Sequence, residues 1–146
     1  MNIRLAKQSD ASAIAELAGQ LGYPTSTEQA IGRLNILLNS VDDIIIVMEG
    51  EEMQIVGWVH VHARPSLIDS PFAEIGGLIV DEAHRSASVG RLLVAEAEAW
   101  AKARGLANLW VRSNIVRDRA HHFYEQLGFQ RLKTQHVLVK DISEQR

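Results

Sequence analysis

The sequence predicts an α/β fold in which a mixed sheet of about seven strands is flanked by four helices. Short segments with alternating or continuous apolar residues, typical of strands, are interspersed with longer segments whose apolar residues recur at helical spacing. The early strands follow one another through short turns and the later ones through helices, so the sheet should be antiparallel at first and parallel at its centre. No repeat, low-complexity tract or linker interrupts the 146 residues, which predicts a single domain over residues 1–146.

The N-terminal half is expected to contain both strands and helices. Its two helices are recognised by apolar stripes at helical spacing and by residues suited to capping. The strand after them is apolar on both faces, which is typical of an internal strand. The expected elements are a strand over 2–6, a helix capped by Ser9 or Asp10 and ended by Gly22-Tyr-Pro24, a helix with a Thr25/Glu28 capping box, and strands over 44–48 and 53–63.

The C-terminal half alternates strands with helices before ending in two strands. Glycines mark the expected ends of both helices, because glycine readily adopts the left-handed conformation found there. The last helix has apolar residues at i, i+3, i+4 and i+7. The expected elements are a strand over 74–80, a helix over 89–104 before Gly105, a strand over 107–112, a helix over 118–127 before Gly128, and strands over 129–132 and 134–140.

Composition excludes several functional classes. Hydrophobic residues make up 47% and charged residues 23%, as in ordinary globular proteins. No apolar run approaches the roughly 20 residues that span a bilayer, and the N-terminus lacks the apolar core of a signal peptide, so we expect a cytoplasmic protein without a membrane partner. The absence of cysteine excludes disulfides, thiol catalysis and cysteine-ligated zinc. A net charge of −3 argues against nucleic-acid binding by bulk electrostatics.

Two segments indicate chemistry. Residues 73–94 read as an apolar strand, a turn, a small-residue loop and a helix that begins near Val89. A helix N-terminus presents free N–H groups and the positive end of the helix dipole, which suits a phosphate group. Residues 117–129 place Tyr124 on a short helix that ends at Gly128. Together they indicate an enzyme that handles a phosphorylated carrier.

The order of elements and these two segments resemble the GNAT superfamily of acyl-CoA-dependent N-acyltransferases over nearly the whole chain. The phosphate-loop motif of that family, Gln/Arg-x-x-Gly-x-Gly/Ala, corresponds to Arg85-Ser-Ala-Ser-Val-Gly90. Arg85 and Gly90 match, whereas Ser88 replaces the middle glycine and Ser86 replaces another common glycine. Glycine is required only where φ is positive or a side chain would strike the ligand, so we expect CoA to bind.

The resemblance implies acetyl-CoA as the acyl donor and assigns its contacts. The backbone of a strand would bond the pantetheine arm, and the N–H groups of Arg85 through Arg91 would surround the pyrophosphate. A bulge at Gly76-Gly77 would help to separate two parallel strands, with the thioester in the gap. The cofactor-binding residues expected in this way are Leu78, Ile79, Val80, Arg85, Ser86, Ala87, Ser88, Val89, Gly90, Arg91 and Asn114.

Amide formation from a thioester requires a neutral amine and a protonated leaving thiolate. Tyr124 matches the tyrosine that, in the family, protonates the departing sulfur. Alternatively, it only fills the apolar stripe beside Phe123. Glu74 precedes Arg85 by eleven residues, the spacing of the base in the histone-acetylating branch of the family. It either takes the amine proton, directly or through water, or is an exposed charge at a strand end.

The acceptor side is expected to involve Tyr23, Trp58 and His60. His60 and His62 share a strand face with Trp58, because side chains alternate along a strand. His60 is interpreted as a pocket wall or a second base, or as a residue that packs at a half-exposed strand end. No third ligand accompanies the two histidines, so we expect no metal.

We therefore expect an N-acetyltransferase that moves an acetyl group from acetyl-CoA to a primary amine of a small molecule. No covalent nucleophile is indicated, which favours direct attack in a ternary complex. The alternatives are a catalytically weak acyl-CoA-binding sensor or interaction module, favoured by Ser86 and Ser88, and an acetyltransferase of protein or peptide amines. A metal-dependent hydrolase lacks a ligand set. The acceptor and the acyl-chain length stay open, and the resemblance implies a homodimer.

Overall fold

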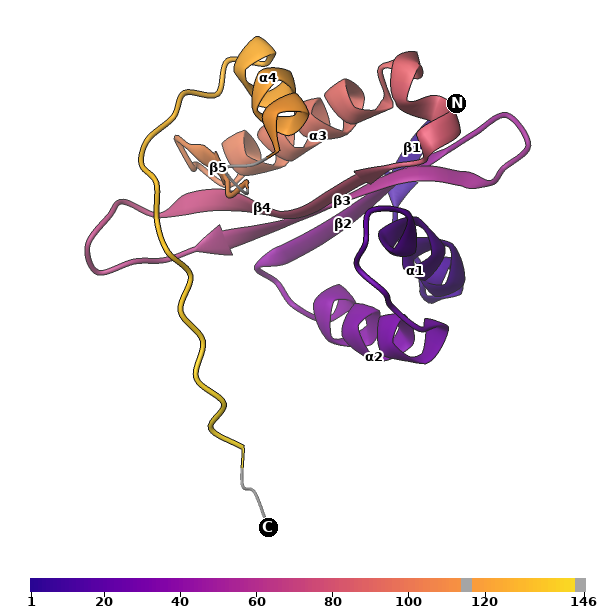
Figure 1. Cartoon of the computed structure of the whole chain (residues 1–146), viewed down its shortest axis with the longest axis horizontal. Coiled ribbons are helices and arrows are strands. Elements are labelled where there is room, and N and C mark those ends of the chain that lie inside the picture. The colour runs from indigo at the N-terminus through magenta and orange to yellow at the C-terminus, as the bar shows by residue number, and fades with distance from the viewer. Residues whose placement is uncertain (114–116, 144–146) are drawn as a thin grey trace. The chain divides into compact units, whose positions relative to one another are not determined.

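The computed structural model describes residues 1–113 and 117–143, and the chain forms two compact units, Met1–Arg112 and Ser113–Arg146. The first unit contains one sheet with helices on both faces (Figure 1). In its described part, the second unit contains one α-helix. The elements are β1 (Asn2–Leu5), the 3-10 helix η1 (Gln8–Asp10), α1 (Ala11–Gln20), α2 (Thr27–Leu38), β2 (Asp43–Glu49), β3 (Ile55–Arg64), β4 (Phe72–Val80), the 3-10 helix η2 (Glu82–Ala87), α3 (Val89–Ala103), β5 (Leu109–Val111) and α4 (Asp118–Gln126).

The sheet is mixed, which confirms the predicted fold class. Its order is β1-β2-β3-β4-β5, with antiparallel pairs up to β4 and a parallel pair between β4 and β5. The described residues form five strands rather than about seven. The predicted strands over 129–132 and 134–140 are wrong, since 129–143 contain no strand. Alternating apolar residues favour an extended chain, but a strand also requires a neighbour with which its backbone can pair.

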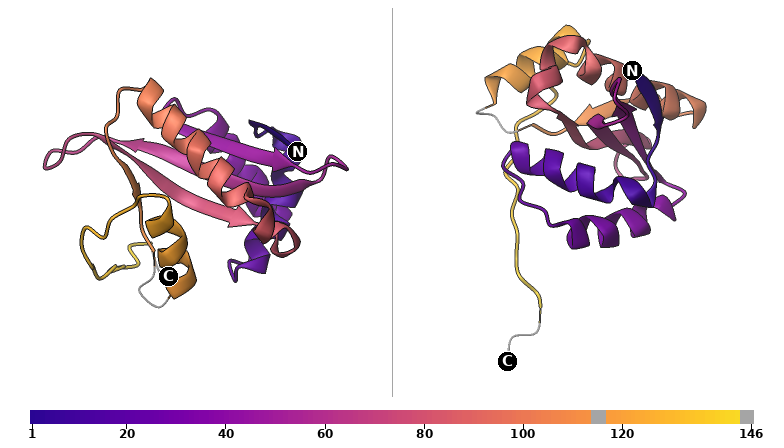
Figure 2. Two further views of the ribbon diagram at one scale, coloured as in Figure 1. Left: turned by 90° about the horizontal axis from the view of Figure 1, so that it is seen from above. Right: turned by 90° about the vertical axis from the view of Figure 1, so that its right-hand side faces the viewer.

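Helices cover both faces of the sheet in the first unit. Figures 1 and 2 show α1 and α2 against one face and α3 against the other. Because both faces are covered, β2 is buried along most of its length, as expected for an internal strand. The inward side chains of α3 are Val89, Leu93, Val94, Ala97 and Ala101. The core under α1 and α2 includes Ala6, Ala11, Ala15, Ala30, Leu34, Ile45 and Val47.

The helix α2 begins with a capping box one residue later than predicted. The N–H of Gln29 donates to Oγ of Ser26 at 3.0 Å, and the N–H of Ser26 donates to Oε1 of Gln29 at 3.0 Å. The predicted pair, Thr25 and Glu28, has the same spacing. Oγ1 of Thr25 instead donates to the carbonyl of Tyr23 at 2.9 Å. Two adjacent pairs with equal spacing cannot be distinguished by spacing alone.

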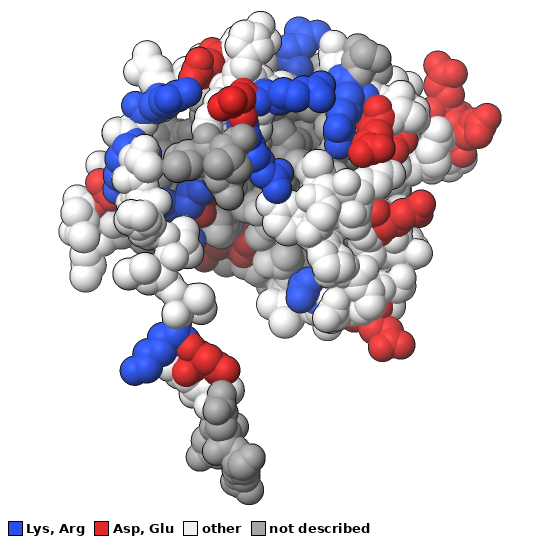
Figure 3. Space-filling model, in the orientation of Figure 1, with Lys and Arg blue, Asp and Glu red and all other residues white. Residues whose placement is uncertain are grey.

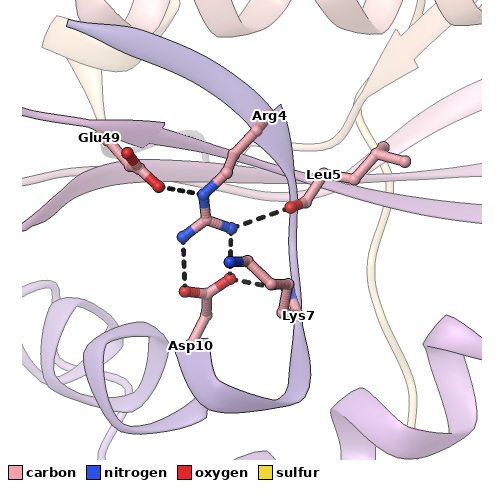
Figure 4. Close-up of polar contacts among 5 residues, drawn as sticks. All are labelled: Arg4, Leu5, Lys7, Asp10 and Glu49. Carbon is pink, nitrogen blue, oxygen red and sulfur yellow. Dashed lines mark hydrogen bonds and ion pairs between the residues drawn. The ribbon is translucent and has the colours of Figure 1, made fainter. Parts of the chain in front are cut away.

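A buried ion pair joins β1 to the first helical turn (Figure 4). Asp10 is 6% exposed, and both of its oxygens accept from the guanidinium of Arg4 at 2.8 Å. Arg4 also donates to Glu49 and to the carbonyl of Leu5. The N–H of Lys7 donates to Asp10, so this carboxylate caps η1 and makes no side-chain cap to α1. The hydrogen bonds from Arg4 hold the pKa of Asp10 below its ordinary value, although burial opposes this.

On the described residues, no helix has both the length and the apolar character needed to cross a bilayer.

We predict that Asp10→Asn lowers the free energy of unfolding at pH 7 by about 2 kcal/mol, because Arg4 loses an ionised acceptor. The pKa of Asp10 is lowered by folding, so its stabilisation is present above the ordinary value of 3.8 and is lost as the pH falls through the folded value. The free energies of unfolding of wild type and variant, measured with urea, should therefore differ less at about pH 2 than at about pH 7. Glu16→Gln, at an exposed carboxyl of α1, is the control. An equal difference at both pH values would contradict the prediction.

Candidate active site

The strand β4 contains a bulge at Gly76, which confirms the bulge expected there. The register between β3 and β4 shifts between His60 and Val61, so Gly76 has no partner opposite it. A Cβ atom at Gly76 would lie 2.9 Å from Nδ1 of His60, and one at Gly77 would lie 2.9 Å from Cζ3 of Trp58. Side chains of β3 therefore leave no room for a larger residue at the bulge.

The bulge changes which backbone groups of β4 face each neighbouring strand. Before it, the N–H of Ala73 donates toward β5, to the carbonyl of Asn108, at 3.0 Å. After it, the N–H of Asp81 donates toward β3, to the carbonyl of Val56, at 2.8 Å. Backbone groups alternate in direction along a strand, so these two odd-numbered residues would face the same side if β4 were regular. The extra residue reverses the alternation.

Beyond the bulge, one edge of β4 is unpaired. Pairing with β5 ends at Ile75, and within the described residues no strand pairs with 76–80 on that side. By alternation, the N–H and C=O groups of Leu78 and Val80 point to this edge, whereas those of Ile79 face β3. An extended ligand that carries amides can hydrogen-bond to such an edge. Leu78 and Val80 are thus the members of the predicted pantetheine-binding segment whose backbone is available.

The predicted phosphate loop leads into the N-terminus of α3. Ser88 adopts the left-handed conformation with φ of 62°, and its side chain does not cap the helix. The N–H groups of Val89, Gly90 and Arg91 lie in the first turn, where no intrahelical acceptor is available. These donors and the positive end of the helix dipole suit an anion.

The residues before Ser88 form η2 (Glu82–Ala87) instead of an irregular loop. Arg85, Ser86 and Ala87 lie in this 3-10 segment, where N–H groups donate to carbonyls three residues earlier. Arg85 is exposed, and its Nη2 is 3.9 Å from Oε1 of Glu82. The backbone donors left for a ligand are therefore concentrated at the start of α3.

Glu74 is buried and engaged on both oxygens. It is 6% exposed, so the interpretation as an exposed charge at a strand end is wrong. Nε of Arg112 donates to its Oε1 at 2.8 Å. Its Oε2 lies 3.0 Å from Nε2 of His62 and 3.6 Å from Nη1 of Arg64. The carboxylate on β4 thus joins β3 to the residue that directly follows β5, and both of its oxygens already accept from cationic or imidazole groups.

His60 has a carboxylate partner on β2. Its Nε2 lies 2.7 Å from Oδ1 of Asp43, and Oγ of Ser40 donates to the other oxygen of Asp43 at 2.6 Å. Burial raises the pKa of Asp43, but the hydrogen bonds from Ser40 and His60 outweigh this and lower it overall. Asp43 is therefore ionised at neutral pH and holds the imidazole ring. The ring of His62 lies 5.3 Å from that of His60.

Tyr23 and Trp58 have different surroundings. Tyr23 lies between α1 and α2 and is 54% exposed. Trp58 packs against the cluster that contains Leu17 and Ile79. Its indole N–H is buried and has no acceptor among the described residues. Trp58 is thus mainly a core residue with one donor that a bound molecule could satisfy.

Tyr124 lies on α4, in the second unit. Its ring is in edge contact with Phe123 at 5.2 Å and with Phe129 at 5.3 Å between centroids. Burial raises the pKa of Tyr124, against a smaller lowering by Arg117, so the hydroxyl keeps its proton at neutral pH. The residue therefore packs on an apolar stripe and has a protonated hydroxyl. Asn114, predicted to contact the cofactor arm, lies outside the described residues.

Acidic and imidazole groups do not gather into a metal site in the parts of the chain that the structure describes, where no three of them are suitably placed. The absence of a metal stays a prediction.

The model of the acetyltransferase (GNAT) family matches residues 13–129. The chain belongs to this family. This confirms the predicted family and the predicted enzyme class, an acetyl-CoA-dependent N-acetyltransferase. GNAT acetyltransferases use acetyl-CoA as their co-substrate.

Known proteins resemble this GNAT chain in sequence and fold. Over 132 residues it is 26% identical to an aminoglycoside N(6')-acetyltransferase type 1 from Stenotrophomonas maltophilia, which covers 88% of this chain and 85% of that one. The crystal structure of an aminoglycoside antibiotic 6'-N-acetyltransferase from Acinetobacter haemolyticus has a TM-score of 0.85 at 22% identity, with 98% and 100% covered. A transcriptional regulator from Bacillus halodurans has a TM-score of 0.78 at 28% identity, with 96% and 97% covered. The GNAT fold is thus confirmed.

Sequence reasoning missed the partners of the polar side chains. Asp43, which directly precedes an apolar run, and Arg112, at the end of a predicted strand, were not singled out. Their importance comes from contacts with His60 and Glu74. The available signal was a set of polar residues at the ends of neighbouring apolar strands. Which of them meet depends on strand register, which local patterns do not specify.

We predict that Ser88→Gly raises the free energy of unfolding by about 1 kcal/mol, because glycine adopts a positive φ without strain. The backbone should keep its shape, so the Kd for CoA should stay equal or fall. Thermal unfolding and calorimetric titration with CoA measure these effects. Ser88→Ala is the matched control, because it removes the hydroxyl and keeps the strain. A less stable glycine variant would contradict the prediction.

Proposed function

We propose that this GNAT enzyme transfers an acetyl group from acetyl-CoA to a primary amine of a small molecule by direct attack in a ternary complex. One observation carries the proposal: the bulge, the unpaired edge of β4 and the N-terminus of α3 follow one another between Gly76 and Arg91. This order corresponds to the thioester, the amide-bearing arm and the diphosphate of acetyl-CoA. The edge supplies hydrogen bonds to amides, and the helix N-terminus attracts phosphate oxygens.

In this proposal the backbone of Leu78 and Val80 bonds the pantetheine arm, with Ile79 between them. The first-turn amides of α3 bind the pyrophosphate, and the exposed side chain of Arg85 lies one turn earlier. The assignments at Ser86, Ala87, Ser88, Val89, Gly90, Arg91 and Asn114 come from the resemblance to the family.

We propose that the acceptor is a cationic small molecule. Its site is lined by Tyr23, Trp58 and His60. The 26% identical relative is named as an acetyltransferase of aminoglycosides, which supports a small amine over a peptide amine. Acidic and basic side chains are interspersed on the face seen in Figure 3. Attraction of a cation would therefore depend on nearby carboxylates such as Asp43 more than on the field of the whole surface.

A catalytically weak acyl-CoA sensor is the second candidate. It is favoured by Ser88, which departs from the glycine of the family motif, and by the 28% identical structure described as a transcriptional regulator. A sensor would bind acetyl-CoA and leave it intact.

Three further predictions belong to this proposal. Residues 1–146 act as one domain, which the family match over 13–129 supports because it runs through both compact units. The cytoplasmic location stays a prediction from the sequence. So does the homodimer, for which the segment after α4 offers exposed apolar side chains at Leu132, Val137, Leu138, Val139 and Ile142.

Two measurements on purified protein test the function. Calorimetry should show binding of acetyl-CoA, and free-thiol release should accelerate with an amine from a panel of aminoglycosides, polyamines and peptides. Mass measurement should find one acetyl group on the acceptor. Binding without turnover on any amine would favour the sensor. No binding of CoA or acetyl-CoA at near-physiological salt would overturn both candidates.

We predict that Tyr124→Phe lowers kcat about 100-fold and leaves the Kd for acetyl-CoA unchanged, because the departing sulfur loses its proton donor. Phenylalanine keeps the ring contacts with Phe123 and Phe129, so thermal stability should not fall. A variant with wild-type kcat would show that Tyr124 serves packing alone.

A further inference from the structure

We propose that His60, oriented by Asp43, is the general base that takes the proton from the attacking amine. This inference rests on the proposed function, which brings the thioester beside the bulge in β4. It selects one of the roles that the sequence left open for His60 and assigns Asp43, on β2, as its positioning residue.

The contacts of Asp43 determine where the proton of the ring lies. An ionised carboxylate only accepts hydrogen bonds, so Nε2 of His60, at 2.7 Å, carries the hydrogen. The lone pair of the neutral ring is then on Nδ1. Ser40 donates to the second oxygen of Asp43 at 2.6 Å and so fixes the carboxylate itself. This is the arrangement that orients a catalytic histidine in carboxylate–histidine pairs.

The basic atom lies beside the bulge. Nδ1 is the nearest atom to the position that a Cβ would occupy on Gly76, at 2.9 Å. Gly76 is exposed although it lies within β4, and the side chain of His60 is 19% exposed. Within the described residues, the hydrogen bond of the His60 ring is at Nε2. Nδ1 therefore lies beside the exposed Gly76, at the point where β4 leaves β5.

The other candidate bases are less suitable. Both oxygens of Glu74 are engaged by Arg112 and His62. His62 is bonded to Glu74, and the three atoms nearest to a Cβ built on Gly76 all belong to His60. Among the described residues, the His60 ring is paired with Asp43 on β2 and lies 5.3 Å from the ring of His62. His62 leads on to Glu74 on β4, whose other charged partners are Arg64 on β3 and Arg112, directly after β5.

The step is balanced as follows. Nδ1 of His60 accepts one proton from the bound ammonium, and the resulting amine nitrogen attacks the thioester carbonyl and forms the C–N bond. The C–S bond then breaks with its electron pair on sulfur, and the thiolate takes the proton of the Tyr124 hydroxyl. The second amine proton, lost through solvent, restores that hydroxyl. The products are the amide and the free thiol of CoA. Asp43 stabilises the imidazolium until His60 returns its proton to water.

Kinetics of His60→Gln and Asp43→Asn, with acetyl-CoA and the best amine of the panel, test the proposal. We expect His60→Gln to lower kcat/KM about 100- to 1,000-fold at neutral pH, and Asp43→Asn to lower it about tenfold or more. The acidic limb of the wild-type kcat/KM profile should disappear in His60→Gln, whose rate should rise with pH toward the pKa of the free amine. His62→Gln, on the same strand face and also bonded to a carboxylate, is the matched control and should keep the wild-type limb.

Calorimetry with acetyl-CoA separates this role from a structural one, because all three variants should bind the donor as wild type does. Near-normal kcat/KM with an unchanged acidic limb in His60→Gln would overturn the proposal, and so would loss of the limb in His62→Gln alone. If the wild-type enzyme binds acetyl-CoA but acetylates no amine, the proposed function itself fails.

Discussion

One extra residue in β4 determines the geometry of the candidate site. The side chains and backbone groups of a strand alternate with a period of two, so a bulge at Gly76 reverses every group beyond it. The reversal coincides with the end of pairing to β5 at Ile75. It leaves amides of Leu78 and Val80 on an unpaired edge. The same bulge requires glycine, because the ring of His60 occupies the space of a Cβ.

Charged side chains are buried in this fold at a tolerable cost in free energy because they occur in pairs. An unpaired buried charge costs several kcal/mol, whereas a hydrogen-bonded pair recovers much of that cost. Asp10 is paired with Arg4, and Glu74 with Arg112. These two pairs connect elements of the fold. Asp43 and His60 form a pair of another kind, because the second ring nitrogen lies beside the exposed Gly76.

Ser88 shows that the phosphate-loop motif carries a physical requirement. The family glycine at this position was expected to matter only if the backbone takes a positive φ, and φ is 62°. Serine adopts this conformation at a cost of roughly 1 kcal/mol, which the surrounding η2 and α3 must offset. Departure from the motif thus adds local strain and leaves the helix N-terminus in place.

The amino-acid pattern alone predicted the four α-helices and the five sheet strands of the described residues, the mixed character of the sheet and the family, because apolar periodicity and short motifs are local properties. The glycines at 76 and 77 marked the bulge. It did not distinguish adjacent capping boxes, and it predicted strands over 129–140 where the described chain has none. Only the tertiary structure decided which polar groups meet. His60 and Asp43 are 17 residues apart and Arg112 and Glu74 are 38 apart, and each contact depends on strand register. Register is decided when whole strands pair and bury their common face. No single segment of the sequence contains that information.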